Sequence, residues 1–226
     1  MEKIYQSLVA RALQICQNKQ RVTPSKRVII ALSGPPGAAK STIAATVVAR
    51  LNSLATRPFA ISLPMDGFLY PRKYLDSLPN YEGAYPSHWS FDAAGVLLLV
   101  KALALSRTNE KEVIQAPEFD PVVGDPVEGA IVVSPDISLV FLEGNYSAYD
   151  PSSWSKDGCF IDDTWLVDED IEMMKHRLAE TDMQIEIEKT WGNATERKRC
   201  MNIPNDVETQ TDVIQQAIVV RTVDGQ

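Results

Sequence analysis

The segment KRVIIALSGPPGAAKSTIAATVVARLNSL, residues 26–54, decides the fold. Its first part is a short β-branched run that ends at Gly34, which is typical of a buried strand in a parallel sheet. Residues 41–54 favour a helix, so the loop between them connects a strand to a helix. Such a loop can bind phosphate, because successive backbone N–H groups and the helix N-terminus form a positive concavity.

The loop matches the phosphate-binding pattern Gly, four residues, Gly, Lys, Ser or Thr at all positions but one. Gly34 opens the pattern and Lys40 and Ser41 close it, but Ala39 stands where the second glycine belongs. We expect Lys40 to reach the outer phosphates of a nucleotide and the Ser41 hydroxyl to bind Mg²⁺. Because Pro35 and Pro36 have no N–H, the predicted backbone donors are Gly37, Ala38, Ala39, Lys40, Ser41 and Thr42.

The alanine at position 39 leaves two interpretations of the loop open. If the φ angle of Ala39 is negative, the extra methyl group costs little, whereas a positive φ would cost roughly 1–2 kcal/mol. The alternative to phosphate binding is that the loop is a glycine-rich turn at the start of an ordinary helix. The strand–loop–helix context favours nucleotide phosphate binding.

The remaining hydrophobic pattern alternates between strands and helices. Helices are predicted at 1–19, at 91–106 with Asp92 as N-cap, and at 168–189. Strands are predicted at 59–66, 112–120, 130–135, 136–145 and 162–168, with a last one within 212–224. This alternation predicts an α/β fold with a mainly parallel sheet. We find no linker or repeat, so residues 1–226 are expected to form a single domain.

Composition narrows the classes of partner. The net charge of −8 argues against nucleic acid or an anionic membrane as the main partner. The three cysteines, Cys16, Cys159 and Cys200, are far apart and form no metal-binding cluster. The N-terminus has no unbroken apolar run, so neither a signal peptide nor a membrane anchor is predicted and a cytoplasmic location is expected.

Two carboxylates follow predicted strands. Asp66 in PMDGFLYP (64–71) and Glu143 in FLEGNY (141–146) would both lie at the carboxyl edge of the sheet, where parallel α/β proteins bind ligands. Asp66 could accept a proton from a substrate hydroxyl, or it could simply begin a turn. Glu143 could hold Mg²⁺, directly or through water, or be a solvated charge at a strand end.

Four residues are weaker candidates for binding an acceptor substrate. Glu118 and Asp120 in APEFDP (116–121) could line the acceptor pocket or begin a turn, and Tyr85 or Trp89 could flank the acceptor. For the tryptophans, packing in the core or lid is the alternative.

The phosphate loop, DGF at 66–68 and EGNY at 143–146, in this order, resemble the uridine kinase/phosphoribulokinase/pantothenate kinase superfamily. Within it, PMDGF, FDA, AP-x-FD and EGNY most resemble nucleoside/nucleotide kinase-like proteins of bacteria and fungi, including those called fructose-transport kinases. The resemblance runs from about Lys26 to Arg177. It implies a three-layer α/β/α P-loop NTPase fold with a mainly parallel central sheet and a helical lid at about 177–204.

The resemblance also implies an activity: an ATP- and Mg²⁺-dependent kinase that phosphorylates a hydroxyl group of a small metabolite. By this resemblance Lys40, Ser41 and Thr42 bind phosphate and metal, Asp66 is the catalytic base and Glu143 supports the metal. Arg177 would be the catalytic cation of the lid.

The chain departs from the close relatives in four places. The first departure is the alanine in the phosphate loop, and the second is Leu69, which replaces a histidine. The third is at Ala84 and Tyr85, which stand near the place of two arginines. The fourth is at Glu180 and Thr181, which replace a basic pair in the lid. The departures at 69 and 84–85 leave the acceptor open among nucleosides, sugars and pantothenate-like alcohols. The departure in the lid leaves the rate open.

Other functions remain as alternatives. A GTPase is disfavoured, because NKQR (18–21) lacks the aspartate of a guanine-reading motif and precedes the phosphate loop. The main rival is a regulatory nucleotide-binding protein of the same fold with weak or no kinase activity. The altered lid favours this rival and the retained Asp66 and Glu143 oppose it. Assembly as a homodimer is left open.

Overall fold

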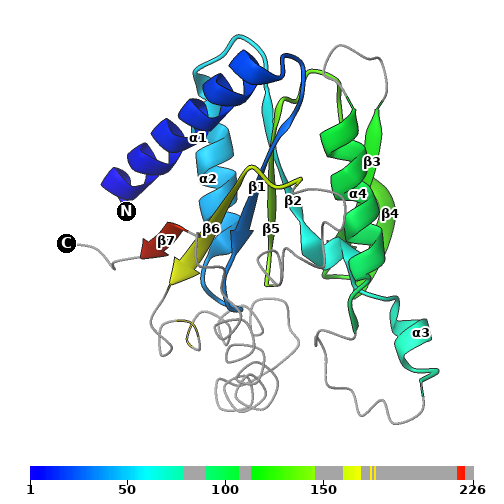
Figure 1. The fold of residues 1–226 in the computed structure, drawn as a ribbon. Coiled ribbons are helices and arrows are strands. Elements are labelled where there is room, and N and C mark those ends of the chain that lie inside the picture. Colours follow the sequence, from blue (N-terminus) through cyan, green and yellow to red (C-terminus); the bar gives the residue numbers. More distant parts are fainter. Residues whose placement is uncertain are drawn as a thin grey trace.

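A five-stranded parallel sheet forms the centre of the structure, and the carboxyl ends of its strands lie at one edge (Figure 1). The computed structural model describes residues 1–78, 90–106, 113–145, 160–168, 174, 176 and 218–221. The sheet order is β2-β5-β1-β6-β7. Its strands are β1 (Val28–Ser33), β2 (Ala60–Pro64), β5 (Leu139–Gly144), β6 (Asp163–Asp168) and β7 (Ile218–Arg221).

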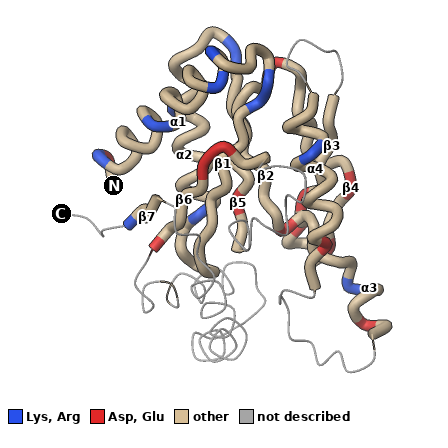
Figure 2. Tube along the Cα trace, viewed as in Figure 1, with Lys and Arg blue, Asp and Glu red and all other residues tan. Residues whose placement is uncertain are grey.

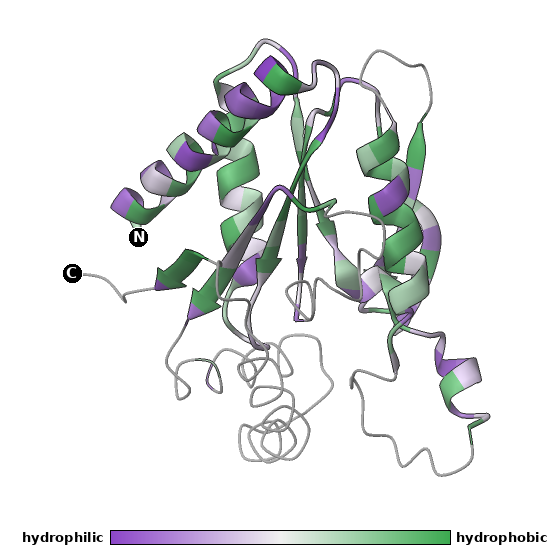
Figure 3. Cartoon of the chain, viewed as in Figure 1, coloured by the Kyte–Doolittle hydropathy of each residue, from purple (hydrophilic) through white to green (hydrophobic). Residues whose placement is uncertain are grey.

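Helices cover both faces of this sheet, which gives three layers (Figure 1). Helices α1 (Glu2–Val22) and α2 (Lys40–Ser53) pack on one face, and α4 (Ala93–Leu105) packs on the other. Figure 3 shows hydrophobic residues along the strands and α4, and alternating hydrophobic and hydrophilic residues along α1. This alternation fits a helix with one buried face and one solvated face.

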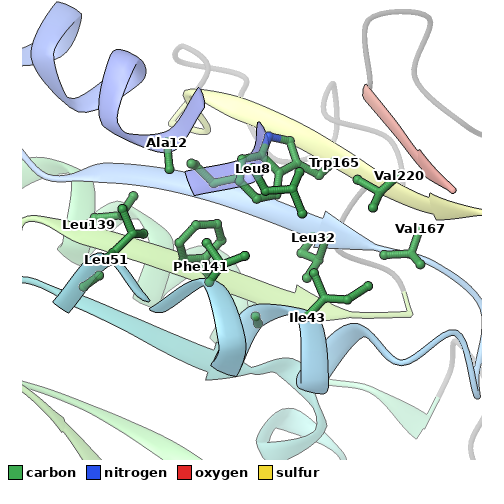
Figure 4. Packing of buried hydrophobic residues seen from close by; sticks show 14 of the residues in the cluster. Leu8, Ala12, Leu32, Ile43, Leu51, Leu139, Phe141, Trp165, Val167 and Val220 are labelled. Atoms are coloured by element: carbon green, nitrogen blue, oxygen red, sulfur yellow. The ribbon is translucent and has the colours of Figure 1, made fainter. Parts of the chain in front are cut away.

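Alternating side chains of the central strands build the two cores. Ile30 and Leu32 of β1 pack with α1 and α2, whereas Ile29 packs on the α4 side. The Phe141 and Trp165 ring centroids lie 5.2 Å apart in the core on the α1 and α2 side, and Figure 4 shows this core with residues from both helices and from the central strands. Because both faces of β1 and β5 are covered, every residue of these two strands is buried.

A separate antiparallel hairpin lies beside α4. It consists of β3 (Ile114–Asp120) and β4 (Asp125–Val133), with an irregular register between Ala116 and Glu118. The hairpin contacts the short 3₁₀ helix η1 (Met65–Phe68), which follows β2. The short helix α3 (Arg72–Leu75) comes next, and its first N–H donates to the Asp125 carboxylate at 2.6 Å.

Within the described residues the predicted strands and helices are largely found, with one correction. The predicted strand at 130–135 begins five residues earlier, at Asp125, because the turn-rich segment before it continues the hairpin. The mainly parallel central sheet is found as predicted, and the antiparallel hairpin forms a second, separate sheet. Asp92 is the N-cap of α4 as predicted, and its carboxylate accepts the Gly95 N–H at 2.9 Å. Most of the predicted helix 168–189 and the lid at 177–204 lie outside the described residues.

Candidate active site

The phosphate loop leaves the central strand β1 and enters α2. At its start, a Cβ on Gly34 would lie 2.9 Å from the Val167 carbonyl oxygen, so only glycine allows this close approach to β6. The Ala38 N–H donates to the Pro35 carbonyl at 3.2 Å, which closes a tight turn. The first α2 bond is the Ile43 N–H to the Ala39 carbonyl at 3.0 Å, so the N–H groups of Ser41 and Thr42 lie in the first turn, at the N-terminal end of the helix.

Ala39 adopts the left-handed conformation that the motif normally reserves for glycine. Its φ and ψ are 59° and 27°, and it is the N-cap of α2 without a side-chain cap. The positive φ places the strain at roughly 1–2 kcal/mol, the costlier of the two outcomes expected for this residue. Ala39 therefore carries backbone strain that a glycine at this position would avoid.

Lys40, the first residue of α2, is held inside the loop. Its side chain is 8% exposed, and its Nζ donates to the Pro35 carbonyl at 2.9 Å and to the Asn145 Oδ1 at 2.8 Å. Hydrogen bonds to an ammonium group are stronger than those between neutral groups, which offsets its partial removal from water. Figure 2 shows several other cationic segments along α1, at the flank of the sheet.

Ser41 and Glu143 meet beside this lysine. The Ser41 hydroxyl donates to the Glu143 Oε1 at 2.8 Å. Glu143 is the fifth residue of β5 and pairs with Leu32 of β1 and Pro64 of β2, so it lies near the carboxyl ends of three neighbouring strands. A hydroxyl and a carboxylate are hard oxygen donors, the chemistry that Mg²⁺ prefers. The described residues contain no cluster of three or more His, Cys, Asp or Glu that could hold a metal. A Mg²⁺ ion held by Ser41 and Glu143 would take its other ligands from water and phosphate oxygens.

Asp66 lies on η1, directly after β2, and close packing fixes this short helix on two sides. A Cβ on Gly67 would lie 2.3 Å from the Pro117 carbonyl oxygen of β3. On the other side, a Cβ on Gly144 would lie 2.7 Å from the Met65 Cβ. Glycines at 67 and 144 therefore let η1 sit between the hairpin and the end of β5, which sets the position of Asp66.

The two carboxylates and the lysine form one electrostatic group. Burial raises the pKa of Asp66, and the nearby Lys40 ammonium lowers it in part. Burial also raises the pKa of Glu143, and the charge of Asp66 adds to this rise, while Lys40 and the Ser41 hydrogen bond oppose it. Asp66 keeps an exposed surface even though the surrounding protein atoms displace part of the water from its carboxylate, whereas Glu143 is only 6% exposed. Two neighbouring carboxylates of raised pKa are a setting that a bound cation would stabilise.

Comparisons with known proteins show which family the chain belongs to. No family model matches the chain. An ATP-dependent kinase-like protein of Aspergillus versicolor is 32% identical over 117 residues, which are 50% of this chain and 68% of that protein. The chain belongs to this family of ATP-dependent kinase-like proteins. A Schizosaccharomyces pombe protein provisionally named a uridine kinase is 34% identical over 162 residues, which are 70% of this chain and 65% of that protein. The kinase-like chain thus spans just under two thirds of that relative.

Solved structures share the fold of the kinase-like chain. One from Silicibacter sp. TM1040, provisionally described as a fructose transport system kinase, has a TM-score of 0.77 at 24% identity and covers 94% of this chain and 98% of its own. The D-glycerate 3-kinase of Cryptococcus neoformans has a TM-score of 0.69 at 11% identity, with 98% of this chain and 97% of that chain covered. These likenesses confirm the predicted fold class, a mainly parallel sheet with flanking helices.

The other predicted site residues of the kinase-like chain either lie on the hairpin or fall outside the described residues. Asp120 accepts the N–H groups of Val122 and Val123 at 2.8 and 3.2 Å, so its carboxylate shapes the hairpin turn. Glu118 is exposed beside the register shift of β3. Tyr85, Trp89 and Arg177 lie outside the described residues, as do Ala84, Glu180 and Thr181. Leu69 is buried and forms an antiparallel bridge with Phe91, so it contributes to packing at this place.

Sequence reasoning missed Asn145 of the kinase-like chain. The residue lies inside the EGNY motif, in which only the glutamate was a candidate for the site. The side-chain oxygen of Asn145 accepts a hydrogen bond from Lys40, and the backbone carbonyl of Asn145 accepts one from the Ser33 hydroxyl at 3.2 Å. Its place one residue after a buried strand that carries a candidate metal ligand was the available signal.

In the described parts of the chain, no helix has the length and apolar character needed to cross a membrane.

Proposed function

We propose that this protein is an ATP- and Mg²⁺-dependent kinase that transfers the γ-phosphoryl group to a hydroxyl group of a small metabolite. One observation carries the proposal: Lys40 and Ser41 at the N-terminus of α2 lie beside Asp66 and Glu143, which come from the ends of two paired strands. A cation, a proposed pair of metal ligands and a candidate base thus share one small region, which supports the proposal. Membership in the ATP-dependent kinase-like family supports the use of ATP.

Phosphate binding is the task of the loop and of Lys40. The N-terminal N–H groups of α2 and the Lys40 ammonium supply positive charge to the outer phosphates. When bound, Mg·ATP supplies the phosphoryl group for transfer and the metal charge that balances its oxygens. Ser41 and Glu143 are the residues that would hold the metal, and their 2.8 Å hydrogen bond keeps the two side-chain oxygens next to each other.

Asp66 is the proposed general base. As the acceptor oxygen bonds to the γ-phosphorus, the hydroxyl proton passes to the Asp66 carboxylate and ADP is released. The raised pKa of Asp66, caused by burial, makes its ionised form a stronger proton acceptor than an ordinary aspartate. The fixed position of η1 holds this carboxylate at the edge of the sheet.

The acceptor class is proposed from the relatives and neighbours. Their names refer to uridine, D-glycerate and fructose, all of which carry free hydroxyl groups. A panel of these three compounds and pantothenate, incubated with the protein, ATP and Mg²⁺, tests the proposal. We expect one acceptor to stimulate ADP release and to yield a phosphorylated product by mass spectrometry. If ATP binds but the full panel gives no such product, the protein fits the rival role of a regulatory nucleotide-binding protein.

A further inference from the structure

Asn145 occupies a position that is fixed through its backbone. It follows Gly144, the last residue of β5, which pairs in register with Ser33 of β1. The Ser33 hydroxyl donates to the Asn145 carbonyl at 3.2 Å. Gly144 itself packs so closely on Met65 that a Cβ there would lie 2.7 Å from the Met65 Cβ. The backbone at 144–145 is therefore tied both to β1 and to the η1 helix that carries Asp66.

The side chain of Asn145 reaches from this fixed backbone to Lys40. Its Oδ1 accepts the Lys40 Nζ at 2.8 Å, and the Pro35 carbonyl accepts the same ammonium at 2.9 Å. An ammonium has only donors, so the amide oxygen of Asn145 must face it. The two acceptors come from different segments, one from the phosphate loop and the other from the end of β5. Both acceptors help to set where the Lys40 ammonium lies.

The neutral charge of both acceptors matters for the function of Lys40. A carboxylate at position 145 would pair with the ammonium and compete with the phosphates of a nucleotide. A neutral amide orients the ammonium without adding a negative charge that would compete with phosphate oxygens. The carboxylates of Asp66 and Glu143 already lie near enough to Lys40 for its charge to lower their pKa values in part. A third one would increase the negative charge that an incoming nucleotide has to meet.

We propose that Asn145 is the positioning residue for Lys40: through its side-chain oxygen it sets the ammonium in place for the phosphoryl group without neutralising it. The catalytic part of this inference rests on the proposed kinase function. The positioning itself is a property of the nucleotide-free protein and can be measured without substrate.

The test uses the full chain and two substitutions at this site. Asn145→Ala removes the acceptor, and Asn145→Asp keeps the shape and adds a charge. Asn52→Ala is the matched control, because Asn52 makes purely local bonds at the other end of α2: its Oδ1 accepts the Phe59 and Ala60 N–H groups and its Nδ2 donates to the Ala60 carbonyl, each at 2.9 Å. The first readout is the ¹⁵N NMR signal of the Lys40 ammonium in the nucleotide-free protein. The others are kcat, the Kd of Mg·ATP and the melting temperature.

We expect Asn145→Ala to weaken or remove the slowly exchanging Lys40 ammonium signal and to lower kcat by about tenfold or more, the loss of one hydrogen bond to a charged group. The Kd of Mg·ATP should change less than kcat does. Asn145→Asp should keep the ammonium signal and weaken Mg·ATP binding by about tenfold or more. Asn52→Ala should lower the melting temperature and leave the ammonium signal and kcat as in the wild type.

Three results would overturn the inference. One is an unchanged Lys40 signal in Asn145→Ala, and another is an Asn145→Asp protein that binds Mg·ATP as tightly as the wild type. The third is a loss of signal and kcat in Asn52→Ala equal to that in Asn145→Ala, since this would show a general loss of structure. If the wild type itself phosphorylates no acceptor, the proposed function fails, while the ammonium signal and the Mg·ATP affinity still decide the placement of Lys40.

Discussion

Ser41 and Glu143 are joined by a 2.8 Å hydrogen bond between the hydroxyl of the first and the Oε1 of the second. The two residues are far apart in the sequence, and the parallel pairing of β1 with β5 brings them together. The register places Glu143 opposite Leu32, close to the point where β1 enters the phosphate loop. A hydroxyl and a buried carboxylate thus come together beside the N-terminus of α2, where a metal-bound phosphate would lie.

Glu143→Gln should raise the Mg²⁺ concentration needed for half-maximal activity by about 10- to 100-fold, the usual loss when a supporting group of a metal site is replaced. Glutamine keeps an oxygen for the Ser41 hydroxyl but removes the negative charge. A Mg²⁺ titration of turnover measures the shift. The exposed Glu128 of β4 offers a charge-matched control, Glu128→Gln, which should titrate as the wild type. Identical titrations of all three proteins would remove Glu143 from the metal site.

Ala39→Gly should stabilise the protein. The substitution relieves about 1–2 kcal/mol of left-handed strain and loses roughly 0.4–1 kcal/mol through the freedom of glycine in the unfolded chain. A net gain of about 1 kcal/mol corresponds to a rise in melting temperature of roughly 2–4 °C for a chain of this size. Mg·ATP affinity should stay the same or increase.

The neighbouring Ala38 gives the control for this prediction. Ala38 is fully buried, and it is absent from the described non-glycine residues with positive φ, Ser25 and Ala39. Ala38→Gly should therefore lower the melting temperature, because it removes packing without relieving strain. Equal changes in both variants would mean that the conformation of Ala39 is not the cause.

Asp66→Asn should raise the melting temperature of the nucleotide-free protein at pH 8 and do so less at pH 4. Burial raises the pKa of Asp66 above its ordinary value of 3.8, so the folded protein binds more protons than the unfolded chain between the two pKa values. Stability is therefore lost as the pH rises through this window, and asparagine removes that loss. Thermal melts at the two pH values measure it. A stabilisation that is the same at pH 4 and pH 8, or a destabilisation at pH 8, would contradict the raised pKa of Asp66.

Much of the fold follows from local patterns. The strands β1 and β5 are fully buried on both faces, so their sequences are continuous apolar runs, and both were predicted to within three residues at each end. The N-cap of α4 was also predicted, because aspartate before an apolar helical run has a local function. The full length of β4 was harder to predict, because this strand contains Pro126 and Gly129, which are typical of turns. Its pairing with β3 extends the strand through these residues.

The candidate site was less predictable where a residue acts through distant partners. The sequence could not decide the φ of Ala39, since alanine is compatible with both helix starts and a strained turn. Asp120 had two interpretations, and the short bonds to Val122 and Val123 give it a role in the turn. Asn145 was missed because an isolated asparagine shows no chemistry until the sheet brings it to Lys40, and its place directly after a buried strand was the one signal available. The predicted roles of Tyr85, Trp89 and Arg177 stay predictions.

Binding of Mg·ATP should depend on Lys40. Lys40→Ala removes the ammonium that is held inside the loop, and calorimetry should show that Mg·ATP binding is lost or weakened by roughly 10- to 100-fold. Lys101 of α4 provides a lysine control: Lys101→Ala should bind as the wild type does, because α4 packs on the opposite face of the sheet from α2. Equal affinity in Lys40→Ala and the wild type would refute the phosphate loop as the nucleotide site.

The most direct measurement is the turnover of Asp66→Asn on an acceptor that the wild type phosphorylates, with the Kd of Mg·ATP determined in parallel. Asparagine keeps the shape of the side chain and removes the proton acceptor. As a control, Asp136→Asn makes the same exchange in the turn before β5, at the opposite end of that strand from Glu143. The proposed mechanism predicts that kcat of Asp66→Asn falls by about 10²–10⁴-fold while the Kd of Mg·ATP changes little, and that Asp136→Asn behaves as the wild type. A kcat for Asp66→Asn equal to that of the wild type would contradict it.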